Sequence, residues 1–200
     1  VRVTTLYLND EKAGSFMRSL LHLDARDLTF TTEKDGRRKV VIDIAALTFG
    51  NAGTTVDSFN RTHTIHIPEA NYKTVLQHGL RYEVAMPVKK PGPYQLRIAV
   101  RDAASDRIGS VSQFIDVPNL TNGRLALSGL LVGKTEEPAQ TEVAGHAPNT
   151  GSDSEANSAV RRFRVGAPLD YAFVVYNAKL DKATSRPQLT RRTHARPSPQ

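Results

Sequence analysis

The clearest sign of fold class lies in residues 88–118, which read VKKPGPYQLRIAVRDAASDRIGSVSQFIDVP. From Tyr94 to Val100 apolar side chains alternate with mostly polar ones, which is the period of a strand with one buried face. A second apolar run ends at Val117, and the polar residues 102–109 separate the two runs. This arrangement predicts an antiparallel hairpin with its loop at 102–109.

A rigid turn precedes the first strand of this hairpin. Pro91, Gly92 and Pro93 stand before Tyr94, and proline leaves little choice of φ at its own position. A tyrosine at the start of a penultimate strand is typical of the tyrosine corner of immunoglobulin-like sandwiches, where its hydroxyl bonds to backbone slightly upstream. We therefore predict a structural role for Tyr94, Pro91 and Gly92, with the hydroxyl bonded within residues 89–92.

The residues before this hairpin repeat the strand pattern. Turn signals in residues 33–37 and 50–53 separate runs of β-branched and apolar side chains. Residues 69–78 alone have helical spacing, with Gly79 as a stop. Turns that recur about every dozen residues predict an all-β fold, an Ig-like or fibronectin-like antiparallel β-sandwich, over residues 1–118.

The rest of the chain has a weaker pattern. In residues 119–182 strand signals occur around 125–132 and 160–176, and about three strands cannot close a sandwich. We expect an incomplete second β domain there. Its residues 134–158 are rich in polar residues, Gly and Pro, which predicts a disordered loop. Residues 183–200 are predicted to form a basic, Pro-rich disordered tail, and we interpret the chain as a fragment that is truncated or altered in reading frame.

Charge and composition exclude several functions. The net charge is +7, but residues 1–182 hold 23 basic and 20 acidic side chains, and the last 18 residues hold four arginines and no acid. The body lacks a basic stripe with interleaved aromatic residues, so we expect no nucleic-acid partner. The absence of Cys excludes disulfides and thiolate chemistry. No apolar run reaches the roughly 18 residues of a membrane span.

Four aspartates are the candidate metal ligands. They lie in or beside predicted turns, and they are Asp24, Asp27, Asp102 and Asp106. Calcium takes several oxygen ligands, so such a group could contribute to a calcium site, although the spacing lacks the density of a dedicated loop. The alternative is turn and cap chemistry, with Arg26 and Arg101 as ion-pair partners.

No motif predicts catalysis. His63 and His66 point to opposite faces of a strand, so they cannot chelate one metal. Residues 129–135 resemble a phosphate loop but are one residue short of its spacing. No serine stands in a Gly-x-Ser-x-Gly elbow, and no carboxylate pair is placed by a motif. We therefore expect no enzymatic activity and no cofactor.

Several blocks in order carry a family resemblance, and they are residues 21–30, 87–102, 109–118, 161–164 and 171–178. Together they resemble the C-terminal β-rich region of acidobacterial-type von Willebrand factor A-related domain proteins, without the A domain itself. The resemblance implies a non-catalytic structural or interaction module of an exported, adhesion-type bacterial protein, secreted or in the cell envelope. The Asp-x-Ser-x-Ser motif of the A domain is absent from this chain, so no metal ligand is carried over.

Such a module would bind a protein partner or a missing neighbouring domain through loops or exposed strand edges. The candidate surfaces are residues 50–53, residues 102–109 and the strands after Leu169. The alternative is a carbohydrate- or peptide-binding accessory sandwich, which needs an exposed aromatic platform. The chain has no Trp, so the interaction candidates are Tyr72, Tyr82 and Tyr171, and at least two should be coplanar on one face.

Overall fold

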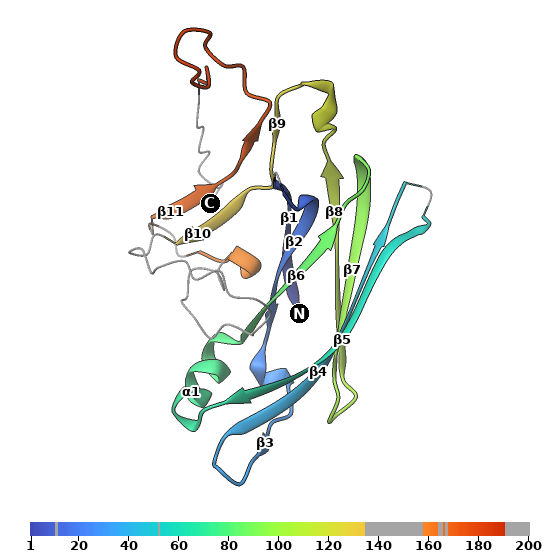
Figure 1. The fold of residues 1–200 in the computed structure, drawn as a ribbon. Coiled ribbons are helices and arrows are strands. Elements are labelled where there is room, and N and C mark those ends of the chain that lie inside the picture. The colour runs from blue at the N-terminus through green and yellow to red at the C-terminus, as the bar shows by residue number, and fades with distance from the viewer. Residues whose placement is uncertain (11, 52, 135–157, 164–165, 167, 191–200) are drawn as a thin grey trace, which may run out of the picture.

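The structure is a computed structural model that describes residues 1–10, 12–51, 53–134, 158–163, 166 and 168–190. Its main body is an antiparallel all-β sandwich of two sheets, as the alternating pattern predicts, and a third layer of short strands lies beside it (Figure 1). The element order follows the predicted hairpins closely, so the sequence period of two determines most of the fold.

The smaller sheet has three strands in the order β1-β2-β6. The strands are β1 (Arg2–Asp10), β2 (Gly14–Leu23) and β6 (Leu80–Pro87). Pairing runs from Arg2 opposite His22 to Asp10 opposite Gly14, which makes β1 and β2 a regular hairpin. Strand β2 pairs on its other side with β6, which comes from much later in the chain. The short 3-10 helix η1 (Ala25–Asp27) follows β2.

The larger sheet has five strands. They are β3 (Thr31–Thr32), β4 (Arg38–Phe49), β5 (Thr55–Ile67), β7 (Gly92–Asp102) and β8 (Ile108–Val117). Strand β4 pairs with β5 on one side and with β7 on the other, and β8 pairs with β7. Both turns predicted from the sequence are present, closed by hydrogen bonds from Gly36 N to Glu33 O and from Gly53 N to Gly50 O (both 3.0 Å).

The core lies between these two sheets. It consists of the alternate side chains that point inward from each strand, and its largest fully buried members are Met17, Leu21, Ile42, Ile44, Ile67, Met86, Leu96 and Ile98. Burying aliphatic side chains of this size stabilises a fold by roughly 1.5–3 kcal/mol each. The two sheets therefore supply most of the stability of the molecule.

The predicted helix carries the chain from one sheet to the other. Helix α1 (Glu69–His78) begins after Pro68 and ends at Gly79, whose φ of 76° is unfavourable for residues with a side chain. Val75 is buried, and Tyr72 and Leu76 pack against the core from the same face. Helix α1 thereby connects β5 of the larger sheet to β6 of the smaller one.

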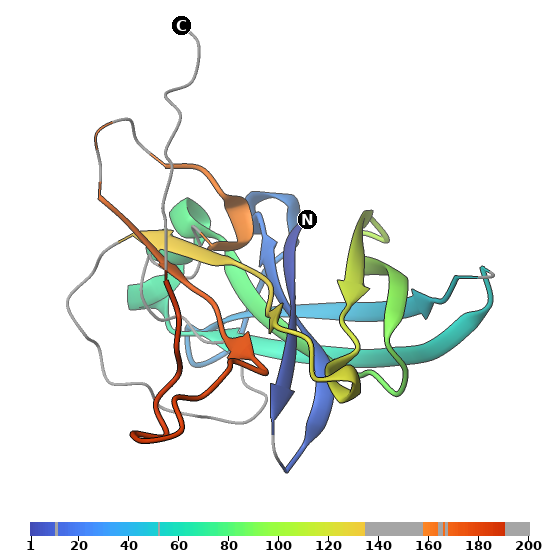
Figure 2. The same cartoon turned by 90° about the horizontal axis from the view of Figure 1, so that it is seen from above.

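The C-terminal strands form the third layer. Strand β9 (Ala126–Leu127) pairs with β12 (Val175–Tyr176), and β10 (Leu131–Lys134) pairs with β11 (Leu169–Ala172). The 3-10 helix η2 (Leu120–Asn122) connects β8 to this layer. The two ladders are short and lie beside β1 rather than in a sandwich of their own (Figures 1 and 2).

The layer covers the outer face of the three-stranded sheet. Thr4, Leu6 and Leu20 alternate with core residues and so point away from the core, yet all three are buried. Thr4 Oγ1 donates a hydrogen bond to the carbonyl of Ser158 (2.8 Å), and Gly129 N donates to the carbonyl of Tyr7 (3.4 Å). This differs from the separate second domain predicted over 119–182, because short strands cannot bury their apolar side chains against one another.

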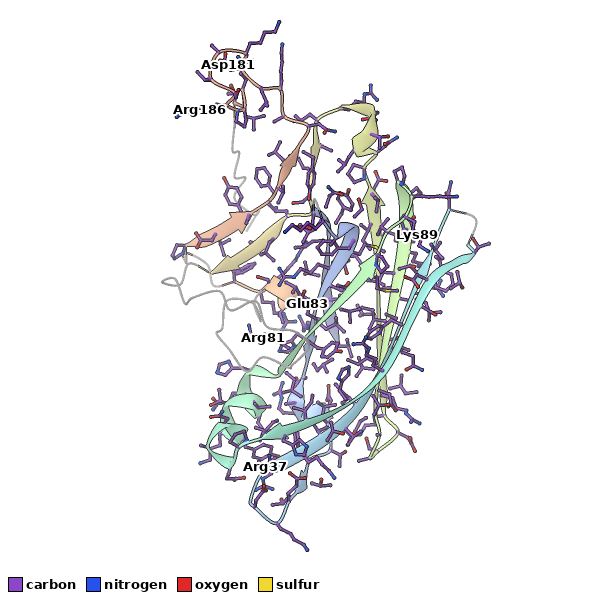
Figure 3. The ribbon with its side chains drawn as sticks, in the orientation of Figure 1. Arg37, Arg81, Glu83, Lys89, Asp181 and Arg186 are labelled. Atoms are coloured by element: carbon purple, nitrogen blue, oxygen red, sulfur yellow. The ribbon has the colours of Figure 1, made fainter. Side chains whose placement is uncertain are left out.

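The predicted tail also has structure where it is described. Asp181 N donates to Arg186 O and Gln188 N donates to Lys179 O (both 2.8 Å), which closes a loop at one end of the molecule (Figure 3). The Asp181 carboxylate holds the loop through Thr184 N (2.9 Å). Residues 183–190 of the predicted tail therefore include part of this hydrogen-bonded loop. The rest of that tail, 191–200, and the predicted loop over 135–157 lie outside the described residues.

Candidate functional site

The turn before β7 has the predicted tyrosine corner. The Tyr94 hydroxyl donates a hydrogen bond to the carbonyl of Lys90 (2.8 Å), and the side chain is buried. Gly92 has a φ of 132°, a region that favours glycine, and Pro91 precedes it. The Tyr94 hydroxyl thus binds to backbone within residues 89–92, as the sequence predicts.

Three of the four candidate calcium ligands share one pocket. Asp24, Asp27 and Asp102 line a pocket of about 240 Å³ together with apolar neighbours such as Leu28. Asp106 is not among its lining residues and pairs with Arg101 instead (3.3 Å). In the part of the chain that the structure describes, no three acidic or histidine side chains are placed to hold a metal ion.

Two of the three carboxylates of this pocket, those of Asp24 and Asp102, are engaged by the protein itself. Arg26 donates to both oxygens of Asp24 (2.9 and 2.6 Å), and these bonds lower the Asp24 pKa to about 2. Burial would raise the pKa of Asp102, but hydrogen bonds from Ser105 Oγ (2.6 Å) and Thr29 N (3.0 Å) outweigh it and lower the pKa. This geometry matches the turn and cap chemistry that the sequence left as the alternative.

Two of the three candidate tyrosines pack within the fold. Tyr82 is buried, burial raises the pKa of its hydroxyl, and it shares a hydrogen bond with His63 Nε2. Tyr72 is half-buried, with its ring edge-on to Phe30 at 5.3 Å and the Arg38 guanidinium 4.8 Å from its centre. Neither tyrosine presents a ring to a ligand, so the predicted platform of coplanar tyrosines does not form.

Tyr171 lies in a different setting. Its side chain is 39% exposed on β11, and the ring is nearly parallel to that of Phe173, with 6° between planes and 6.3 Å between centres. Phe173 is 36% exposed. The sequence reasoning missed Phe173, although the spacing of two residues along a strand pattern placed both rings on one face.

The third layer has further exposed apolar side chains. The large ones on or next to the short strands are Leu125, Leu127, Leu130, Leu169 and Val174. Val174 N is held by the Ser128 hydroxyl (2.8 Å), which ties the two ladders together. We call Tyr171, Phe173 and the four leucines the aromatic face. A grouping of exposed apolar side chains is typical of a binding surface.

The edge of β1 is closed by groups from three other segments. Gln113 of β8 accepts a hydrogen bond from Thr5 N (2.9 Å) and donates one to Thr5 O (3.0 Å). Tyr7 O accepts from Gly129, and Asn9 N donates to the Tyr176 hydroxyl (2.9 Å). Strand β1 therefore offers little free backbone for pairing, and no sequence signal pointed to Gln113.

The two predicted hairpin loops are present as turns. The loop from Asp102 to Gly109 is closed by Asp102 N donating to Arg107 O (2.9 Å). The turn after β4 lies at the tip of the long β4–β5 hairpin, which projects from the body of the molecule (Figure 2). Strand β5 lies at the edge of its sheet, and among the described strands it pairs with β4 alone.

Comparisons with known proteins give little information beyond this geometry. No protein-family model and no curated protein match the chain. Among solved structures, a beta-glucuronidase of Bacteroides uniformis is similar with a TM-score of 0.34 and 10% identity, over 58% of this chain and 13% of that chain. A calcium-binding mutant of Bacteroides uniformis beta-glucuronidase 2 is similar with a TM-score of 0.35 and 12% identity, over 63% and 13%. We draw no conclusion from likenesses at this level.

No helix in the described ranges is long and apolar enough to cross a membrane.

Proposed function

We propose that this chain is a non-catalytic interaction module that binds a protein partner or a neighbouring domain through the aromatic face. The observation that carries the proposal is the stacked pair of Tyr171 and Phe173, both exposed, in a layer of short strands that also exposes several leucines. Aromatic residues are enriched at the centres of protein interfaces, where a few of them supply most of the binding energy.

In this proposal the module belongs to an exported, adhesion-type bacterial protein, secreted or in the cell envelope. The support is the resemblance of the chain to the β-rich region of von Willebrand factor A-related proteins. A rigid sandwich with a separate binding layer suits such a role, because the fold and the binding face then depend on different residues.

The second candidate is a carbohydrate- or peptide-binding accessory sandwich. The parallel rings of Tyr171 and Phe173 favour it, since such rings stack on the flat faces of sugars and on proline. They are one tyrosine and one phenylalanine rather than the two tyrosines that the sequence suggested. The two candidates differ in the ligand and share the same face.

The test is a selection of peptide ligands from a display library, run alongside a panel of immobilised polysaccharides. We expect peptide ligands whose affinity falls about 30-fold or more on Tyr171→Ala or Phe173→Ala, the loss typical of an interface hot spot. Phe114→Ala is the matched control, because Phe114 is an exposed aromatic residue on β8, in the larger sheet.

Polysaccharide binding with the same sensitivity would favour the accessory sandwich. Ligands that bind the wild type and all three variants equally would contradict both candidates.

A further inference from the structure

Strand β5 presents a long edge with which no other described strand pairs. Its 13 residues lie at the margin of the five-stranded sheet, and β4 is its partner on one side. One outward backbone group of this edge is hydrogen-bonded in the described part of the chain. It is Ser58 N, which donates to the Asp57 carboxylate (2.8 Å). This contrasts with β1, whose edge Gln113, Gly129 and Tyr176 cover.

The pairing of β4 shows which groups of β5 point outward. Val41 O accepts from Ala103 N on the β7 side, and Gly50 N donates to Thr54 O on the β5 side. Backbone groups alternate along a strand, so even-numbered residues of β4 bond to odd-numbered residues of β5. The backbone groups of Val56, Ser58, Asn60, Thr62 and Thr64 therefore face away from the sheet.

The charged side chains on this edge carry opposite charges on the two sides of Phe59. Asp57 and Arg61 lie two residues before and after Phe59, and all three point to the same face. The Arg61 guanidinium lies 5.0 Å from the centre of the Phe59 ring. Among the residues that the structure describes, neither Asp57 nor Arg61 takes part in an ion pair.

We propose that two copies of this chain pair antiparallel through β5, with Phe59 on the two-fold axis. The two Phe59 rings then lie opposite each other, and Asp57 faces the partner subunit's Arg61 on both sides of the axis. On the other face Ser58 lies opposite the partner subunit's Asn60. The same surface serves both copies, as a two-fold interface requires.

The backbone geometry agrees with this register. Each even-numbered residue meets an even-numbered residue of the second copy, so their outward N–H and C=O groups can exchange hydrogen bonds. Phe59 then falls at a pair without hydrogen bonds, where opposite Cβ atoms are about 4.5–5.5 Å apart. The two five-stranded sheets become one continuous sheet.

A neighbouring register is the main competitor. With Asn60 on the axis, Asp57 would face His63 and Arg61 would face Phe59 of the second copy. That register loses both Asp–Arg pairs, whose opposite charges stabilise a cross-strand pair. Charge complementarity therefore favours Phe59 on the axis.

Charge exchange tests the proposal in the full chain by sedimentation equilibrium at low and high salt. Wild type is expected to dimerise, and Asp57→Arg or Arg61→Asp alone should weaken the dimer roughly tenfold or more, because like charges then face each other. The double variant Asp57→Arg/Arg61→Asp should restore it. An equimolar mixture of the two single variants should form a mixed dimer.

Cross-linking tests the register. The chain has no native Cys, so any disulfide must come from the introduced residue. Phe59→Cys should form a disulfide-linked dimer under mild oxidation, and Thr64→Cys, on the same strand, should not. Circular dichroism of Phe59→Cys checks that the variant is folded, and the charge variants test the same interface without altering Phe59.

A monomeric wild type at all accessible concentrations would overturn the proposal. So would a dimer that ignores the charge exchange, or a linked dimer from Asn60→Cys but none from Phe59→Cys. The inference does not rest on the binding proposed for the aromatic face, which lies on the other side of the molecule (Figure 1). Tyr171→Ala should leave the dimer unchanged, so a failure of the dimer proposal can be told apart from a failure of the binding proposal.

Discussion

The sandwich of residues 1–118 and the layer of residues 119–190 use similar side chains with opposite results. In the sandwich, every strand except the two-residue β3 has eight to thirteen residues, and alternate side chains form the core between the two sheets, where Ile44 is 0% exposed. In the layer, strands of two to four residues leave Leu127 53% exposed. The sandwich is ordered by its own core, and the layer is ordered by the surface on which it lies.

The largest expected effect is the loss of core packing in the sandwich. Ile44→Ala should lower the free energy of unfolding by about 2–5 kcal/mol, because a buried cavity replaces the side chain. Leu127→Ala, at an exposed position of the layer, should lower it by less than about 1 kcal/mol. Urea denaturation followed by circular dichroism measures both, and equal losses would contradict the comparison.

A smaller effect is expected where the sandwich fixes its own loop. Asp102→Asn should cost about 1.5–3 kcal/mol at pH 7, since Asp102 accepts hydrogen bonds from Thr29 and Ser105 as a charged group. The folded pKa of Asp102 is lowered, so this stability is present above the unfolded pKa of about 3.9 and is lost as pH falls through the folded value.

The difference between wild type and Asp102→Asn should therefore shrink between pH 5 and pH 2 in thermal melts. Asp106→Asn is the control, because Asp106 is an exposed member of the same loop. A pH-independent difference would contradict the assignment.

Next comes the contact that holds the layer in place. A Cβ atom on Gly129 would lie 2.9 Å from Leu6 Cα, so Gly129→Ala should force the layer away from β1 at a cost of about 1–3 kcal/mol. Hydrogen exchange of the Asn9 amide, which donates to Tyr176, should accelerate. Leu130→Ala, at the next and exposed position, should leave the Asn9 amide protected. Faster exchange of the Asn9 amide in Leu130→Ala as well would contradict a specific role of Gly129.

The smallest expected effect concerns the tyrosine corner. Tyr94→Phe removes one hydrogen bond to Lys90 and should lower the free energy of unfolding by about 1 kcal/mol without changing the fold. Tyr176→Phe removes the corresponding bond between layer and sandwich and should cost a similar amount. Chemical denaturation of both variants measures these losses. An unchanged free energy of unfolding for Tyr94→Phe would contradict a stabilising role of the tyrosine corner.

The two regions also differ in how far the sequence predicts them. Local patterns suffice for the hairpins, for the helix that ends at Gly79 and for the hydrogen bond of Tyr94, because each depends on residues close in the chain. The position of Gly129 against Leu6 depends on contact between distant segments. The apolar run around Gly129 is too short to show a periodicity that would predict this contact. Gln113 shows the same limit, since a polar residue on a strand carries no sign of the edge that it closes.

The candidate site follows the same rule. Of the four aspartates that the sequence groups by their positions in turns, Asp24, Asp27 and Asp102 line one pocket and Asp106 does not. The bonds of Asp102 to Thr29 and Ser105 are set by the tertiary fold. Tyr171 is one of the three candidate tyrosines, and Phe173 stands two residues further along the same alternating pattern. Tyr82 is buried because helix α1 carries β6 into the smaller sheet.

The most direct test of the central claim is the thermal unfolding midpoint of a chain that ends after Asn119, compared with that of the full chain. Without the layer, Leu6 and Leu20 on the outer face of the three-stranded sheet are exposed to water. We predict that the truncated chain still unfolds cooperatively, because the core lies between its own two sheets, but with a lower midpoint and with binding of a hydrophobic dye that the full chain does not bind. An unchanged midpoint and no dye binding would show that the layer does not stabilise the sandwich, and would contradict the account.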